Sequence, residues 1–213
     1  MYNVIRVVHF AEAADASDRA EYIETVRIAV KELGALRQLV APTLPGVING
    51  GDALVHLHFP SAEVAARHTV ELDAALRGPI TVRVDGVGYP ARPAQARLNE
   101  PRTLYRALLI RVDPSVAADA VERFERDLLK MPDYISSIVA WRLSRVTDSV
   151  GSTEWTHVWE QEFTDRAALM GQYLNHPVHW SVVDRWFDPE CPESVVRDRV
   201  CHTFCTVDDI VVE

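Results

Sequence analysis

Two halves of this 213-residue chain predict the same succession of secondary structure. A segment with three prolines, residues 89–101, separates them and is typical of an extended linker. Runs of β-branched and apolar residues predict strands, and apolar residues three or four positions apart predict helices. Each half then has the order βαββαβ. We place the halves at residues 1–90 and 103–213, with residues 91–102 as the linker.

The predicted elements have similar spacing in the two halves. In the first half, strands are expected at 2–10, 36–41, 52–59 and 80–88, and helices at 17–33 and from Ser61 to about Leu76. In the second half, strands are expected at 104–112, 135–146, 154–163 and within 195–212, and helices at 114–130, from Thr164 or Asp165 to about Leu174, and at 179–187. Ser17 and Ser61 are the expected N-caps of the first two helices. Pro132 is expected to end a helix, and Pro177 to break one.

This repeat predicts the fold class. A βαββαβ unit forms a four-stranded antiparallel sheet with helices on one face only, so its other face must be covered as well. Two such sheets packed face to face cover each other. We therefore predict an α+β fold in which two tandem ferredoxin-like units form a barrel within one chain.

Composition excludes several classes of function. Acidic residues exceed basic ones, 31 to 22, for a net charge of −9, which argues against binding to nucleic acid. No apolar stretch reaches the roughly 20 residues that a membrane span needs. The N-terminal residues resemble a strand and not a signal peptide. We expect a cytoplasmic protein without membrane or nucleic-acid partners.

The three cysteines, Cys191, Cys201 and Cys205, lie near the C-terminal end. An odd and sparse count argues against a disulfide framework and favours a reducing compartment. A zinc site with His202 is the alternative, but the spacing matches no paired ligand motif. Cys201 and Cys205 also share one side of a strand, so we interpret them as buried structural residues and predict no metal site.

All five tryptophans lie in the second half. In the strand at 154–163, alternation places Trp155, His157, Trp159 and Gln161 on one face. An imidazole between two indoles would form an amphipathic pocket wall. The alternative is that His157 is a buried, hydrogen-bonded structural histidine.

Candidate acid and base groups follow in the segment Tyr173-Leu-Asn-His-Pro-Val-His179. A helix break at Pro177 can turn ring side chains inward, and Tyr173, His179 and His157 in one cavity would provide proton donors and acceptors near neutral pH. In the alternative interpretation, this segment is a helix corner in which His176 caps backbone carbonyls.

The first half has no counterpart of this segment. Its His56 and His58 share the strand face opposite Val55, Leu57 and Phe59. A metal pair is conceivable at this spacing, but no third ligand with matching spacing accompanies it. We therefore favour a polar or interfacial face.

These motifs together resemble the stress-responsive dimeric α+β barrel family, Dabb. The resemblance covers about residues 103–210 and rests on LYRALLIRV, Pro132, WTHVWEQEF and YLNHPVHWSVVDRWF. It implies a ferredoxin-like barrel of the kind usually built by two chains, with the first half as a degenerate copy. A homodimer of the whole chain is also compatible with it.

The resemblance also implies roles for individual residues. In olivetolic acid cyclase-like polyketide cyclases of this family, a tyrosine and the second histidine of HPxH form the acid/base pair of a cofactor-free aldol cyclisation. Tyr173 and His179 match that pair, and His157 matches the histidine of the upstream strand. Arg106 and Phe124 stand where the family has a histidine and a tyrosine. The substrate-binding candidates are Arg106, Phe124, Trp155, Trp159, His176 and Trp180.

Three functional hypotheses follow. The leading one is a cofactor-independent lyase or cyclase of the aldol type, with Tyr173, His179 and His157 as catalytic residues and a phenolic or polyketide-like substrate. The second is a non-catalytic, stress-associated or small-molecule-binding barrel. The third is a cofactor-free monooxygenase.

Overall fold

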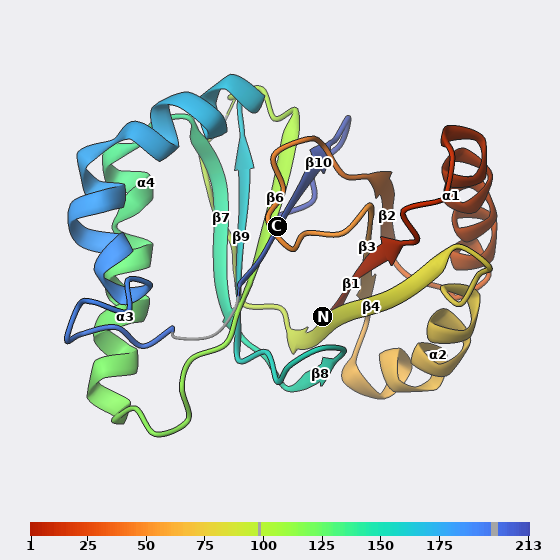
Figure 1. The fold of residues 1–213 in the computed structure, drawn as a ribbon, viewed down its shortest axis with the longest axis horizontal. Helices are drawn as coiled ribbons and strands as arrows, with labels where there is room; N and C mark the ends of the chain where they lie inside the picture. Colours follow the sequence, from red (N-terminus) through yellow and green to blue (C-terminus); the bar gives the residue numbers. More distant parts are fainter. Residues whose placement is uncertain (98, 197–199) are drawn as a thin grey trace.

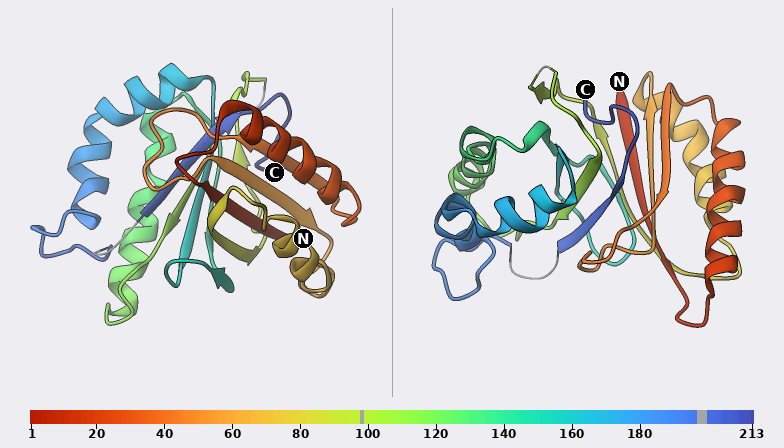
Figure 2. Two further views of the ribbon diagram at one scale, coloured as in Figure 1. Left: turned by 45° about the vertical axis from the view of Figure 1, so that its right-hand side comes forward. Right: turned by 90° about the horizontal axis from the view of Figure 1, so that it is seen from above.

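The computed structural model describes residues 1–97, 99–196 and 200–213. Two antiparallel sheets pack face to face, and helices cover the outer side of each (Figures 1 and 2). Leu98 of the predicted linker and residues 197–199 of the predicted final strand lie outside the described residues. None of the described helices combines the length and apolar character needed to cross a bilayer.

The two halves build their sheets in the same order. The first sheet runs β2 (Arg37–Pro42), β3 (Ala53–Phe59), β1 (Tyr2–Phe10), β4 (Thr81–Pro90), and α1 (Ala16–Lys31) and α2 (Ala62–Ala75) cover it. The second sheet runs β10 (Val200–Thr206), β6 (Leu104–Ile110), β9 (His157–Phe163), β7 (Ile138–Arg145). Its outer face carries α3 (Ala118–Leu129), α4 (Met131–Tyr134), η1 (Ala168–Tyr173), η2 (His179–Val183) and η3 (Asp184–Trp186). The tandem α+β fold is confirmed.

Two short strands were not expected from the sequence. β5 (Gln95–Ala96) lies in the predicted linker and pairs with β7. β8 (Asp148–Val150) lies between the strands predicted at 135–146 and 154–163 and pairs with β4 of the first sheet. Ile48, in the loop between β2 and β3, forms an isolated β-bridge with His202 of β10, an edge strand of the second sheet. The second half therefore contributes a strand to the sheet of the first half.

A buried carboxylate fixes the turn after β8. Asp85 Oδ1 accepts hydrogen bonds from Ser152 N at 2.7 Å and Ser152 Oγ at 2.6 Å. Gly151 precedes it with a φ of 106°, and a Cβ there would lie 2.4 Å from Asp85 Oδ1. Only glycine fits this left-handed backbone and this close approach.

Alternation divides the core into three layers of side chains. On β3, Val55, Leu57 and Phe59 face α1 and α2, whereas Leu54 lies between the two sheets. His56 is fully buried on the side of Leu54. The face predicted for His56 and His58 is thus the face toward the second sheet.

Some boundaries differ from the prediction because other side chains cap the helices. Asp15, and not Ser17, is the N-cap of α1: its carboxylate accepts from Ser17 N at 2.7 Å and Asp18 N at 2.9 Å. Ser61 caps α2 as expected. Helix α3 begins at Ala118, later than predicted. Pro132 lies in the first turn of α4, where the missing N–H costs nothing, so it does not itself end α3.

Candidate functional site

A cavity of about 240 Å³ lies between the second sheet and the helical segment η1–η3. We call it the helix-side cavity. It is lined by Ile48, Arg106, Leu108, Leu128, Met131, Trp159, Tyr173, Leu174, His179, Val183, Asp184, Phe187, Val200 and His202. Aliphatic and aromatic residues dominate, and a few polar groups converge among them, which is the composition of a small-molecule site.

Tyr173 is the centre of the polar contacts. Its hydroxyl accepts a hydrogen bond from Arg106 Nη1 at 3.0 Å, and the guanidinium lies 5.0 Å from the centre of its ring. Arg106 also donates to Gln161. The imidazole of His179 meets the Tyr173 ring edge to face, with the ring centres 4.9 Å apart. The predicted acid/base pair is therefore in contact, through its rings.

The local backbone brings Tyr173 and His179 together. Tyr173 ends η1 and His179 begins η2, and both segments have π-helical turns, which occur frequently at functional sites. The chain bends at His176, directly before Pro177. His179 N donates to His176 O at 2.9 Å across this corner. His179 Nδ1 lies 3.4 Å from Asp184 Oδ1, which restricts the orientation of the imidazole.

His202 is a cavity residue that the sequence analysis did not assign to the site. It lies on β10 opposite Leu108 of β6. Its Nε2 is buried and finds no hydrogen-bond partner within the described part of the chain. Burial, and after it the neighbouring Arg106 guanidinium and His179 imidazole, lower the pKa of His202 to about 2, so the His202 imidazole is neutral. The same alternation that pairs Cys201 with Cys205 could have placed His202 on the opposite face.

His157 does not share this cavity, contrary to the expectation. Its Nε2 lies 3.1 Å from Glu125 Oε1, and its Nδ1 lies 2.8 Å from Thr156 Oγ1. Burial lowers the pKa of His157 against the opposing effect of Glu125. Its ring packs edge to face on Phe124. This environment matches the alternative of a buried, hydrogen-bonded histidine.

Four of the six predicted substrate-binding residues also lie outside this cavity. Trp155 belongs to the apolar cluster between the sheets. Its backbone N–H donates to Ser149 Oγ of β8, and it precedes the regular alternation of β9, which begins at His157. Phe124 is packed against Trp186 and Phe187. Trp180 is exposed, and His176 Nδ1 accepts a hydrogen bond from Val178 N, a contact in which the imidazole is the acceptor and not the cap of a carbonyl. Of the predicted aromatic wall, only Trp159 lines the cavity.

Cys201 and Cys205 point to one side of β10 and His202 to the other. Cys201 and Cys205 are buried between the sheets, where burial raises the pKa of both thiols, to about 12 for Cys205. His202 faces the helix-side cavity instead. Among residues 1–97, 99–196 and 200–213, no three His, Cys, Asp or Glu side chains are grouped to hold a metal ion.

Comparison with known proteins agrees with this architecture. Residues 104–201 match the family model of the stress responsive A/B barrel domain, Dabb. This confirms the resemblance noted in the sequence. No curated protein sequence matches the chain significantly.

Solved structures of similar fold cover nearly the whole chain. An anthrone oxidase-like protein aligns with a TM-score of 0.70 at 10% identity, over 98% of this chain and 91% of that one. A candidate monooxygenase from Fusobacterium nucleatum aligns with a TM-score of 0.56 at 9% identity, over 95% and 90%. Another from Lactobacillus acidophilus aligns with a TM-score of 0.52 at 10% identity, over 97% and 99%. At such identities, the likeness concerns the fold.

Proposed function

We propose that the chain is a cofactor-independent enzyme that moves protons on a small phenolic or polyketide-like molecule, as a carbon–carbon lyase or cyclase of the aldol type. The observation that carries this proposal is the contact of Tyr173 and His179 in an apolar cavity, with the Arg106 guanidinium on the tyrosine hydroxyl. Proton donors and acceptors in a largely apolar site act more strongly than they do in water.

His179 is the proposed base. With Asp184 near Nδ1, the favoured tautomer carries its proton there and leaves the lone pair on Nε2. Nε2 would remove a proton from the carbon next to a substrate carbonyl. The resulting carbanion attacks a second carbonyl of the same molecule, so that a carbon–carbon bond forms while the electrons of that carbonyl move to its oxygen.

Tyr173 is the proposed acid. Because its oxygen accepts the Arg106 hydrogen bond, its own O–H is available to donate to the developing oxyanion. After that proton has moved, the protonated His179 beside it returns a proton to the tyrosine and closes the cycle. Retro-aldol cleavage follows the same steps in reverse and requires no external oxidant or reductant.

A second candidate is cofactor-free oxygenation, which the names of the aligned structures favour: one is anthrone oxidase-like and two are candidate monooxygenases. The first step would be the same deprotonation by His179. The carbanion or phenolate would then react with molecular oxygen, one atom becoming a new carbonyl of the product and the other leaving as water. Consumption of oxygen therefore separates the two candidates.

The decisive experiment measures turnover of β-diketones, anthrones and hydroquinones with and without oxygen, in the wild type and variants. We expect His179→Ala and Tyr173→Phe to lower kcat by about 10²–10⁴ while the unfolding transition stays close to that of the wild type. His68→Ala, at a partly exposed position on α2 and outside the helix-side cavity, serves as the control and should keep full activity.

Each result leads to one conclusion. Turnover without oxygen supports the lyase or cyclase, and turnover that stops under anaerobic conditions supports the monooxygenase. If His179→Ala and the milder His179→Gln both unfold, or if both retain turnover, the proposed role of His179 is wrong. Saturable binding of these compounds by a wild type that converts none of them would instead support a binding barrel.

A further inference from the structure

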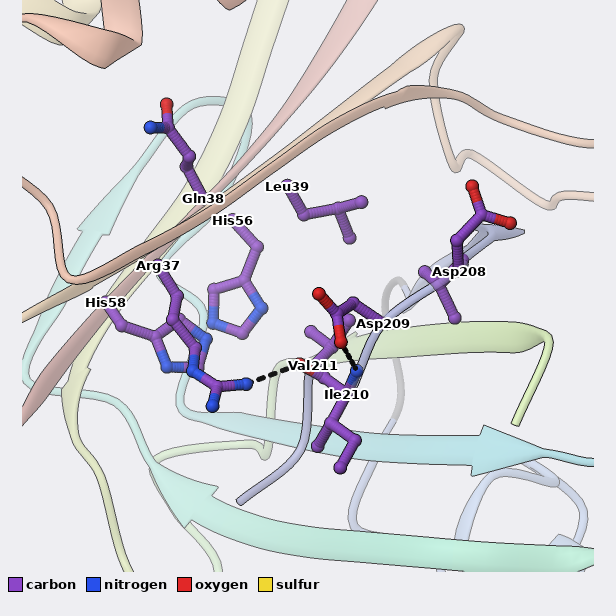
Figure 3. A pocket seen from close by; sticks show the side chains of 10 residues that line it. Arg37, Gln38, Leu39, His56, His58, Asp208, Asp209, Ile210 and Val211 are labelled. Atoms are coloured by element: carbon purple, nitrogen blue, oxygen red, sulfur yellow. Dashed lines mark hydrogen bonds between the residues drawn. The ribbon is translucent and has the colours of Figure 1, made fainter. Parts of the chain in front are cut away.

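A second cavity, of about 330 Å³, lies between the inner face of β2 and β3 and the C-terminal segment. We call it the inter-sheet cavity. It is lined by Arg37, Gln38, Leu39, His56, His58 and residues 207–211. Figure 3 shows the two imidazoles and Arg37 on one side and the C-terminal segment on the other. It shares no lining residue with the helix-side cavity.

The two histidines have unused hydrogen-bonding capacity. His56 and His58 are 0% and 2% exposed, and their ring centres lie 4.4 Å apart. Within the described residues, neither ring nitrogen of His56 nor Nδ1 of His58 has a hydrogen-bond partner. Buried polar atoms are nearly always satisfied, so these nitrogens call for a partner that enters the cavity.

The neighbouring charged groups are already paired. Arg142 Nε and Nη2 donate to the two oxygens of Glu160, at 2.7 and 3.0 Å, and Tyr105 donates to the same carboxylate at 3.0 Å. Burial lowers the pKa of both histidines, that of His58 to about 4. Each imidazole is therefore neutral near pH 7 and offers one donor and one acceptor.

The C-terminal segment forms one wall of this cavity, and its Glu213 carboxylate pairs with Arg37. Arg37 Nη2 lies 2.5 Å from Glu213 Oε1, and Arg37 Nη1 donates to Ile210 O at 2.9 Å. Both members of the ion pair are partly exposed, at 44% and 36% of their side-chain surface. Exposed ion pairs contribute little net stability, so another carboxylate can compete for Arg37.

We propose that the inter-sheet cavity is a second ligand site, for a small planar aromatic carboxylate that replaces Glu213 on Arg37 and lies against the imidazoles of His56 and His58. Its ring would pack on Leu39 and the two imidazoles, and a ring hydroxyl or carbonyl would exchange hydrogen bonds with their free nitrogens. The volume lies at the lower end of the usual range for small-molecule pockets, which is about 300–1,000 Å³.

The exchange at Arg37 moves the Glu213 side chain and leaves the backbone of the C-terminal segment in place. Val211 N donates to Glu162 Oε1 at 2.7 Å, and Arg142 Nη1 donates to Glu213 O at 2.9 Å, so the segment stays anchored. One carboxylate replaces another on Arg37, and the net charge next to the guanidinium does not change. The proposal is independent of the proposed enzymatic function, because its residues come from the first sheet and the C-terminal segment and none of them lines the helix-side cavity.

The test uses 2-naphthoate as the probe and the neutral 2-naphthamide as its control, with the full chain, by calorimetry. We expect the wild type to bind 2-naphthoate and to bind 2-naphthamide at least about tenfold more weakly. Glu213→Gln, which removes the competing carboxylate, should tighten binding of 2-naphthoate by about threefold. Arg37→Gln should weaken it about tenfold or more, and Arg67→Gln on α2 should leave it unchanged.

A second readout identifies the site and does not depend on a substitution. In the wild type, the NMR signals of the imidazole C–H groups of His56 and His58 should shift on titration with 2-naphthoate. The proposal is wrong if Arg37→Gln binds as tightly as the wild type, if only signals of Tyr173 and His179 move, or if nothing moves up to about 10 mM probe. Because Tyr173→Phe should not affect naphthoate binding, failure of the enzymatic proposal remains a separate result.

Discussion

Arg106 is a charged side chain held almost entirely away from water, at 4% exposure, by two neutral acceptors, Gln161 and Tyr173. Burying a charge costs free energy unless hydrogen bonds and a nearby countercharge compensate for it. A positive charge that is compensated only by neutral oxygens stabilises negative charge that develops on a bound molecule. At the scale of one residue, Arg106 is thus the group best placed to stabilise an oxyanion.

Arg106→Met should lower the activity strongly and change the stability little. The variant should lose about 10²–10³ in kcat, because the positive charge at the tyrosine hydroxyl disappears. Its free energy of unfolding should change by less than about 1.5 kcal/mol, because relief of the buried charge offsets the loss of two hydrogen bonds.

Denaturant unfolding and steady-state kinetics measure these two quantities separately. A variant that is strongly destabilised but retains turnover per folded molecule would contradict the assignment and make Arg106 a purely structural residue. Arg126→Met on α3, which replaces the same type of side chain outside the cavity, is the matched control for both measurements.

Local sequence signals predicted the elements well where the decisive contact lies within the element itself. The strands around Val55 and Leu108 follow from alternation, and Ser61 caps α2 as expected. In contrast, β5 and β8 are two and three residues long and exist only through pairing with distant strands. No periodicity in so short a segment can reveal its partner.

The same distinction explains which site residues the sequence could predict. Tyr173 and His179 are six positions apart in one helical corner, so their contact is local. His157 is directed away from them by Glu125 on another helix, and the backbone N–H of Trp155 donates to Ser149. Both contacts join segments whose proximity depends on the assembled fold.

The cap of α1 gives a test at the scale of an element. Asp15 accepts two backbone N–H groups of the first turn, whereas Ser17 donates only its backbone N–H to that carboxylate. We expect Asp15→Ala to lower the free energy of unfolding by about 1 kcal/mol. Ser17→Ala should change it by less than about 0.5 kcal/mol. Equal losses measured by denaturant unfolding, or a larger loss for Ser17→Ala, would show that the cap is assigned to the wrong residue.

At the scale of the whole molecule, the space between the sheets contains ionisable groups as well as apolar side chains. His58 faces Glu160, Arg142 and Arg37, and burial is the largest cause of its low pKa, about 4. In the unfolded chain a histidine has a pKa of about 6.5. The unfolded state therefore binds more protons between these values, and stability is lost as the pH falls from about 6.5 towards about 4.

We expect this loss to be smaller in His58→Gln, which cannot bind the proton. The free energies of unfolding of wild type and variant, measured from pH 7.5 to pH 4.5, should converge as the pH falls. His68→Gln, at a partly exposed position on α2, should run parallel to the wild type. A constant difference between wild type and His58→Gln across this range would mean that His58 does not contribute to the pH dependence.

The pairing of β8 with β4 also has a consequence for the time at which the fold can form. During synthesis, domains generally fold from the N-terminal side as the chain emerges at about 5–20 residues per second. The edge of the first sheet at β4 cannot be completed before residue 150 has left the ribosome, well after its own strands are available. Until then the nascent first half exposes an unpaired strand edge and the inner face with His56 and His58. The first sheet is thus completed only when part of the second half has emerged, and the nascent chain depends on that later part to cover this strand edge.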